Sequence, residues 1–96
     1  MSRYVLSPRA QGDLSDIWDY TAEHWGAEQA NAYLRVLQRA IEVVAHDPRR
    51  GRPYDEVREG YRAHLAGSHM LIYRVLESGI VVVRVLHSRM DFERHL

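Results

Sequence analysis

Two apolar runs near the C-terminus dominate the hydrophobic pattern of this chain. His69 to Leu76 and Ile80 to Leu86 are rich in β-branched residues, and Ser78-Gly79 lies between them. This composition and spacing predict a tight β-hairpin. A two-residue turn at Ser78-Gly79 would place Met70 opposite His87. Because apolar side chains then line both faces, the hairpin is predicted to be the centre of a sheet that needs cover on both sides.

Two amphipathic helices are predicted before this hairpin. Ser7 is a suitable N-cap and Pro8 suits the first helical position. Apolar residues then recur at helical spacing until Gly26, and a second apolar stripe ends at Asp47-Pro48. The helices are therefore expected at about residues 8–25 and 27–46. Their junction is so short that they must form an antiparallel helical hairpin.

The remaining segments complete an α+β fold. Arg3 to Leu6 has the pattern of a short strand, and Pro48 to Gly60 is a polar loop. Tyr61 to Ala66 is a third strand that turns at Gly67-Ser68 into the hairpin, which gives an antiparallel meander over about residues 61–88. We predict one domain, residues 1–96, in which an N-terminal strand and the helical hairpin pack on this three-stranded meander. The sheet edge that the first strand joins stays open.

Composition excludes several classes of protein. The 96 residues include 13 basic and 13 acidic side chains, and this balance argues against bulk attraction to nucleic acid or to an anionic membrane. Without cysteine there is neither a disulfide framework nor a thiolate metal site. No segment approaches the roughly 18 apolar residues of a membrane span, and the N-terminus does not resemble a signal peptide. We therefore expect a soluble cytoplasmic protein without a cofactor.

The six histidines do not predict a metal site, because no pair has a recognised zinc-ligand spacing. His87 is the exception that merits attention, since it ends the predicted central strand. A general acid at this position would need neighbours that set its pKa. Its predicted cross-strand neighbour, Met70, supplies neither charge nor proton, which favours a structural histidine.

The arginines leave two readings open. They could bind phosphate, or they could pair with carboxylates such as Glu77 or Asp91. The residues concerned are Arg49, Arg50, Arg52, Arg62, Arg74, Arg84 and Arg89. Two of them, Arg74 and Arg84, are flanked by apolar residues, so pairing would require a buried partner.

The first predicted helix carries regularly spaced carboxylates and two tryptophans. The carboxylates are expected to form a solvated face, and the tryptophans are expected in the core rather than in a base-stacking platform. These residues are Asp13, Asp16, Asp19, Glu23, Trp18 and Trp25.

Several short motifs, each weak alone, occur in an order and spacing that resemble the ParE branch of the RelE/ParE toxins of bacterial type II toxin–antitoxin systems. The resemblance covers nearly the whole chain. The motifs are Ser7-Pro8, Trp25-Gly26, Asp47-Pro48-Arg49, Gly60-Tyr61-Arg62, Gly67-Ser68-His69, Ile72-Tyr73-Arg74-Val75 and Val85 to Asp91.

The resemblance implies a toxin that is neutralised by a cognate antitoxin, a protein with a DNA-binding domain and a flexible arm. It also implies plasmid stabilisation and a higher-order toxin–antitoxin hetero-oligomer. ParE-like members inhibit DNA gyrase and so block replication, whereas RelE-like members are ribosome-dependent mRNA endoribonucleases. An arm that orders on binding would cover the apolar sheet.

The choice between the two branches decides whether the chain is an enzyme. RelE-like nucleases place a basic residue on the hairpin strand opposite a histidine or tyrosine, whereas this chain has Met70 there and Ser88 after His87. We therefore predict a non-enzymatic gyrase inhibitor without catalytic residues. If the chain were a nuclease, His87, Arg62 and Arg84 would be its catalytic residues.

Two interaction surfaces are predicted. The target is expected to contact the C-terminal tail at Arg89, Met90, Asp91 and Phe92. The antitoxin arm is expected to contact apolar residues of the first helix and the hairpin, namely Leu14, Ile17, Trp18, Leu71, Tyr73, Val75, Val83 and Val85.

Overall fold

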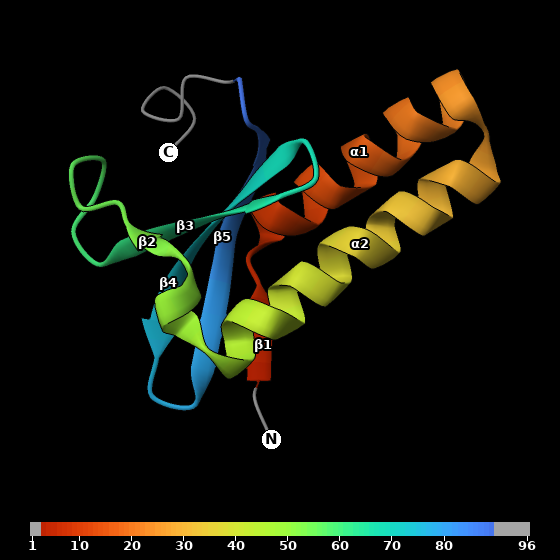
Figure 1. The fold of residues 1–96 in the computed structure, drawn as a ribbon. Coiled ribbons are helices and arrows are strands. Elements are labelled where there is room, and N and C mark those ends of the chain that lie inside the picture. Colours follow the sequence, from red (N-terminus) through yellow and green to blue (C-terminus); the bar gives the residue numbers. More distant parts are fainter. Residues whose placement is uncertain (1–2, 90–96) are drawn as a thin grey trace.

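A helical hairpin lies against one face of a mixed five-stranded sheet in the computed structural model, which describes residues 3–89 (Figure 1). The predicted helical hairpin and antiparallel meander are confirmed. The elements are β1 (Arg3–Leu6), α1 (Pro8–Trp25), α2 (Ala27–His46), the short 3-10 helix η1 (Pro48–Arg50), β2 (Arg52–Pro53), β3 (Tyr61–Ala66), β4 (His69–Leu76) and β5 (Gly79–His87).

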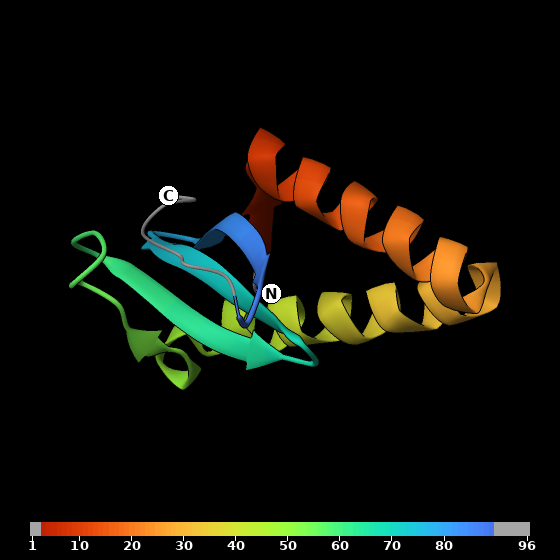
Figure 2. The same ribbon diagram turned by 90° about the horizontal axis from the view of Figure 1, so that it is seen from above.

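Ser7 both starts α1 and ties it to the sheet. Its hydroxyl oxygen accepts a hydrogen bond from the Ala10 N–H at 3.0 Å, as expected of an N-cap, and donates one to the Val83 carbonyl at 2.7 Å. At the other end of α1, Gly26 has a φ of +93°, a conformation that glycine adopts without strain. From the sheet, the hairpin projects outward to this turn (Figure 2). Neither helix is long and apolar enough to span a membrane within the described part of the chain.

The strand order is β1-β5-β4-β3-β2, which places β1 at the edge that the sequence left open. β1 runs parallel to β5, with Arg3 beside Gly79 and Leu6 beside Val82. At the opposite edge, β2 pairs with β3 in antiparallel fashion inside the segment that was predicted to be a loop. The meander is therefore the centre of a larger sheet.

The predicted hairpin register is wrong. Leu76 pairs with Gly79, so the turn is Glu77-Ser78, and an irregularity at Ile72/Tyr73 shifts the register once more. His87 consequently lies opposite His69 rather than opposite Met70. The physical reason is a contact with β1: a Cβ atom at Gly79 would overlap the Arg3 carbonyl, so this glycine allows close strand approach instead of forming the turn.

Apolar side chains are buried on both faces of the sheet, as predicted. The larger cluster lies between the sheet and the helices and includes Leu37, Ile41, Val44, Leu71, Tyr73, Ile80, Val82 and Val85. A smaller cluster, on the face away from the helices, contains Tyr61, Ala63, Ile72 and Leu86, with Tyr54, Met70 and Val83 packed against it. The helices thus cover one face completely enough to bury Leu71 and Tyr73.

Candidate interaction site

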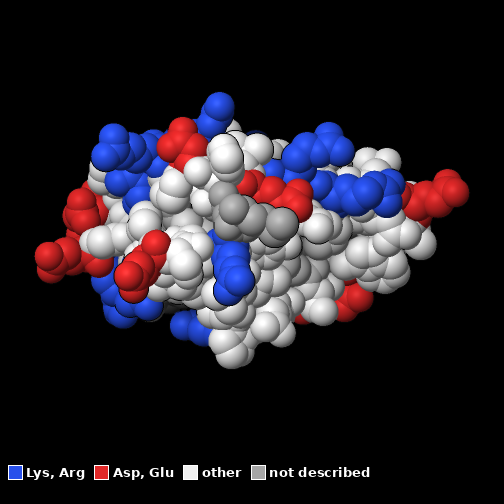
Figure 3. Space-filling model, turned by 90° about the horizontal axis from the view of Figure 1, so that it is seen from below, with Lys and Arg blue, Asp and Glu red and all other residues white. Residues whose placement is uncertain are grey.

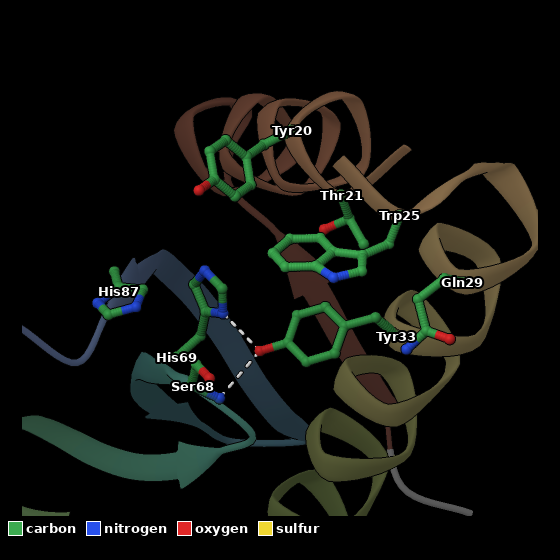
Figure 4. A pocket seen from close by; sticks show the side chains of 8 residues that line it. All are labelled: Tyr20, Thr21, Trp25, Gln29, Tyr33, Ser68, His69 and His87. Atoms are coloured by element: carbon green, nitrogen blue, oxygen red, sulfur yellow. Dashed lines mark hydrogen bonds between the residues drawn. The ribbon is translucent and has the colours of Figure 1, made fainter. Parts of the chain in front are cut away.

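A pocket of about 390 Å³ opens where the distal half of the helical hairpin passes the end of the sheet (Figure 4). Aromatic side chains from the two helices form one wall, and two histidines from β4 and β5 form the other. We call it the histidine pocket. Its lining residues are Tyr20, Thr21, Trp25, Gln29, Tyr33, Ser68, His69 and His87.

Tyr33 of α2 connects the two walls. Its hydroxyl group lies 2.6 Å from Nδ1 of His69 and accepts a hydrogen bond from the Ser68 N–H at 3.0 Å (Figure 4). The ring can reach this position because residue 67 is glycine: a Cβ there would lie 2.8 Å from the Tyr33 ring. The turn between β3 and β4 is thereby fixed to the N-terminal half of α2.

His69 and His87 face each other across the β4–β5 pair. Their ring centroids are 5.4 Å apart with the rings nearly perpendicular, and the Arg89 N–H donates to Nδ1 of His87 at 3.2 Å. Burial, followed by the charge of His87, lowers the pKa of His69, and Asp13 acts in the opposite direction. His69 is therefore kept neutral at a pH where an exposed histidine would already bind a proton.

The rim of the pocket is formed by strongly exposed aromatic residues. Trp25 is 64% exposed and Tyr20 is 58% exposed. The Tyr20 ring stacks on His24 at 4.1 Å between centroids, and Trp25 lies 6.2 Å from Tyr20. The prediction that Trp25 belongs to the core is wrong, because the end of α1 extends past the sheet. Trp18 is half-buried, and its Nε1 donates to Asn31 of α2 at 2.8 Å.

Asp13 is the partner of Arg84. The Arg84 Nε and a terminal nitrogen each donate to its carboxylate at 2.8 Å, and the Val85 N–H donates to the same carboxylate at 2.9 Å. Both side chains are nearly buried, at 11% and 13% exposure. Asp13 is therefore not part of a solvated face, contrary to the prediction. Its carboxylate instead binds the β5 backbone at Val85, beyond the point where β1 ends. Arg84 thus has the buried partner that the sequence analysis required, whereas Arg74, the other strand arginine, is exposed.

Arg62 is held by the loop after α2. Its guanidinium donates to the Gly51 carbonyl at 2.6 and 3.0 Å. Arg62 lies on β3, whereas Arg84 lies on β5 and is bound by Asp13 of α1, so the two guanidinium groups are held by different partners on strands that are not neighbours. The structure therefore does not assemble Arg62, Arg84 and His87 into one catalytic group.

The loop arginines show no built phosphate site. Arg50 lies 4.0 Å from Asp47 and Arg52 lies 3.8 Å from Glu56, in exposed ion pairs that contribute little to stability. Arginine and carboxylate side chains alternate over the face shown in Figure 3, without a continuous basic surface on that face. Within residues 3–89, no group of three or more His, Asp or Glu side chains is arranged to hold a metal ion.

Some of the residues predicted to bind the antitoxin are buried, and the others are accessible. Leu71, Tyr73 and Val85 are buried beneath the helices and offer no surface in this fold. Val75 is 48% exposed, and the half-buried members of the set are Leu14, Ile17, Trp18 and Val83. For these five accessible residues the antitoxin contact stays a prediction.

The predicted target surface lies mostly outside residues 3–89. Arg89 is exposed, whereas Met90, Asp91 and Phe92 lie outside the described residues. Sequence reasoning singled out His87 but did not predict the histidine pocket around it, and it missed Tyr20, Tyr33 and His69. The signal that could have indicated it was the correct hairpin register, which pairs His69 with His87.

Known proteins match this chain over almost its entire length. The family model "ParE toxin of type II toxin-antitoxin system, parDE" matches residues 4–92. Toxin ParE1 of Mycobacterium tuberculosis is 57% identical over 96 residues, which cover 99% of this chain and 98% of that protein.

Two solved structures share the fold. The chromosomal ParDE TA system from P. aeruginosa has a TM-score of 0.78 at 18% identity, over 91% of this chain and 96% of that chain. The toxin–antitoxin complex RelBE2 from Mycobacterium tuberculosis has a TM-score of 0.62 at 23% identity, over 90% and 96%. At these identities the likeness concerns the fold alone, and it confirms the predicted RelE/ParE-like architecture.

Proposed function

This chain belongs to the ParE toxin family of type II toxin–antitoxin systems, and we propose that it inhibits DNA gyrase, blocks replication and is neutralised by a cognate antitoxin. The observation that carries the proposal is the family match over residues 4–92 together with 57% identity to a protein named Toxin ParE1. Gyrase acts on the chromosome, so the toxin would work in the cytoplasm. A flexible antitoxin arm would bind it there and assemble a higher-order hetero-oligomer.

Within residues 3–89, the engagement of Arg62 and Arg84 by other groups of the chain supports a non-enzymatic toxin. Cleavage of RNA develops charge on a phosphate, and this charge needs a cation that is available to it. Arg84 is engaged by Asp13, and Arg62 is engaged by the Gly51 carbonyl two strands away. Inhibition would then depend on binding to the target protein rather than on chemistry.

A RelE-type ribonuclease is the second candidate, and one observation favours it. His87 faces a second imidazole, that of His69, instead of the predicted Met70. Two adjacent imidazoles could act as acid and base. The engagement of both arginines weighs against this candidate.

A gyrase assay tests the proposal. The purified chain is expected to block ATP-dependent supercoiling of relaxed plasmid and to trap cleaved DNA, while in vitro translation with purified ribosomes proceeds normally. Addition of the cognate antitoxin serves as the control and should restore supercoiling. Inhibited translation beside normal supercoiling would refute the gyrase proposal and favour the ribonuclease.

A second test concerns the tail as the surface that contacts the target. Deletion of residues 89–96 is expected to abolish toxicity in expressing cells, whereas His87→Ala reduces it much less, because a protein-binding surface needs the charged and apolar side chains beyond β5. Circular dichroism and antitoxin binding should show that the truncated chain is folded. Equal loss of toxicity in both variants would contradict a target surface on the tail.

A further inference from the structure

We propose that the histidine pocket receives a carboxylate side chain, flanked by apolar residues, from the arm of the antitoxin. This inference rests on the proposed function and assigns the partner chemistry of one site. Three features carry it: the tautomers of the two histidines, the charge of the lining residues and the exposed aromatic rim.

The hydrogen bonds at Tyr33 determine which ring nitrogen of His69 carries the proton. The Tyr33 oxygen accepts from the Ser68 N–H, so its own proton finds an acceptor in Nδ1 of His69, 2.6 Å away. In the neutral imidazole the ring proton then lies on Nε2. This second nitrogen points away from Tyr33, toward the open side of the pocket below Tyr20 (Figure 4).

His87 has the same polarity. The Arg89 backbone N–H donates to its Nδ1 at 3.2 Å, and an N–H donor requires that this nitrogen accept. The neutral ring of His87 therefore also carries its proton on Nε2. Two imidazole N–H donors on neighbouring strands, with ring centroids 5.4 Å apart, suit a ligand that offers two acceptor oxygens.

The charge of the site selects an anion. None of the eight lining residues carries a carboxylate, and two of them are histidines. The acidic group that acts on His69 is Asp13, whose carboxylate is already bound to Arg84 and to the Val85 N–H. The charge of His87 disfavours protonation of His69, and an anion between the two rings would offset this effect.

The exposed aromatic rim favours a protein ligand in which apolar side chains flank the carboxylate. Trp25 and Tyr20 are more than half exposed although they are large aromatic residues, and such residues often anchor protein interfaces. In the same pocket, Tyr20 lies above His69, and Trp25 lies to the side of it (Figure 4). An apolar side chain on either side of the carboxylate would cover these rings and exclude water, which strengthens the charge-assisted hydrogen bonds.

Asparagine and glutamine substitutions test the roles of the two histidine ring nitrogens separately. In His69→Asn and His87→Asn the amide oxygen replaces Nδ1, so the bonds to Tyr33 and to the Arg89 N–H are kept while the Nε2 donor is lost. In His87→Gln the longer amide places a donor near the position of Nε2. His46→Asn, an exposed histidine at the end of α2 outside the pocket, is the matched control.

The experiment measures the affinity of each full-length variant for the cognate antitoxin by calorimetry. Each asparagine variant should bind about 10- to 100-fold more weakly, as expected for the loss of one charge-assisted hydrogen bond, whereas His87→Gln and His46→Asn should bind like the wild type. Acidic residues of the antitoxin arm are then changed one by one to amides. One of these changes should weaken binding to the wild type but not to the double variant His69→Asn/His87→Asn.

The possible outcomes separate the two proposals. If wild type and asparagine variants bind the antitoxin equally, or if no single carboxylate of the arm couples to the histidines, the carboxylate site is refuted while the toxin–antitoxin function stands. If the antitoxin does not bind the wild-type chain at all, the proposed function itself fails. Equal weakening by His87→Asn and His87→Gln would indicate a steric role of the ring and would also overturn the proposal.

Discussion

Asp13→Ala is expected to lower the free energy of unfolding by about 3–5 kcal/mol, the cost of leaving one member of a buried ion pair without its partner. The variant removes the carboxylate that binds the Arg84 guanidinium at 2.8 Å and also accepts from the Val85 N–H at 2.9 Å. Arg84 as a residue is only 9% exposed, so water cannot readily replace the carboxylate. Urea denaturation followed by circular dichroism measures this loss, which is a large share of the stability of a small domain.

Two further variants show whether the effect belongs to the buried charge. Asp16→Ala removes an exposed carboxylate from the same helix and should change stability by less than about 0.5 kcal/mol. Asp13→Ala combined with Arg84→Met removes both charges and should recover much of the lost stability. If the double variant is as unstable as the sum of the single variants, the pair is not coupled and the interpretation is wrong.

Tyr73→Phe is expected to cost about 1–3 kcal/mol for each buried polar group that it leaves unpaired. The Tyr73 hydroxyl donates to the Pro48 carbonyl at 2.5 Å and accepts from the Gly51 N–H at 3.0 Å. Tyr73 is fully buried, and burial raises the pKa of its hydroxyl. Removal of one oxygen atom should therefore loosen the segment that follows α2.

Hydrogen exchange of the Gly51 amide, together with urea denaturation, measures this effect. Exchange at Gly51 should accelerate in Tyr73→Phe, while Tyr20→Phe, which alters an exposed hydroxyl, should leave both exchange and stability unchanged. Unchanged protection of the Gly51 amide would show that the loop is held by other contacts, such as the Arg62 bonds to the Gly51 carbonyl.

Tyr73 also illustrates why burial could not be read from a strand pattern. Apolar residues on both strand faces correctly predicted a sheet that needs cover, but the pattern is the same whether the cover comes from the chain's own helices or from a partner. The structure places Leu71 and Tyr73 under α2 and leaves Val75 exposed at the far end of the same strand. Helix length and position, rather than strand composition, decide which residues remain accessible.

The sequence by itself determined the two long helices and the three strands of the meander. The Ser7 cap, the glycine after α1 and the proline after α2 act on neighbouring residues, so the helix limits at 8–25 and 27–46 followed from local rules. Alternating and β-branched runs likewise located β3, β4 and β5 to within about a residue. The family resemblance was also contained in short motifs and their order, and the family match confirms it.

Only the tertiary structure decided the details that matter for function. The partnership of Asp13 with Arg84 joins residues 71 positions apart, and the pairing of His69 with His87 depends on a strand register that β1 helps to set. Neither leaves a local trace, because a shift of one residue in register exchanges the faces of a strand without changing its composition. The histidine pocket arises in the same way, from side chains of four separate elements that meet only once the hairpin is docked on the sheet.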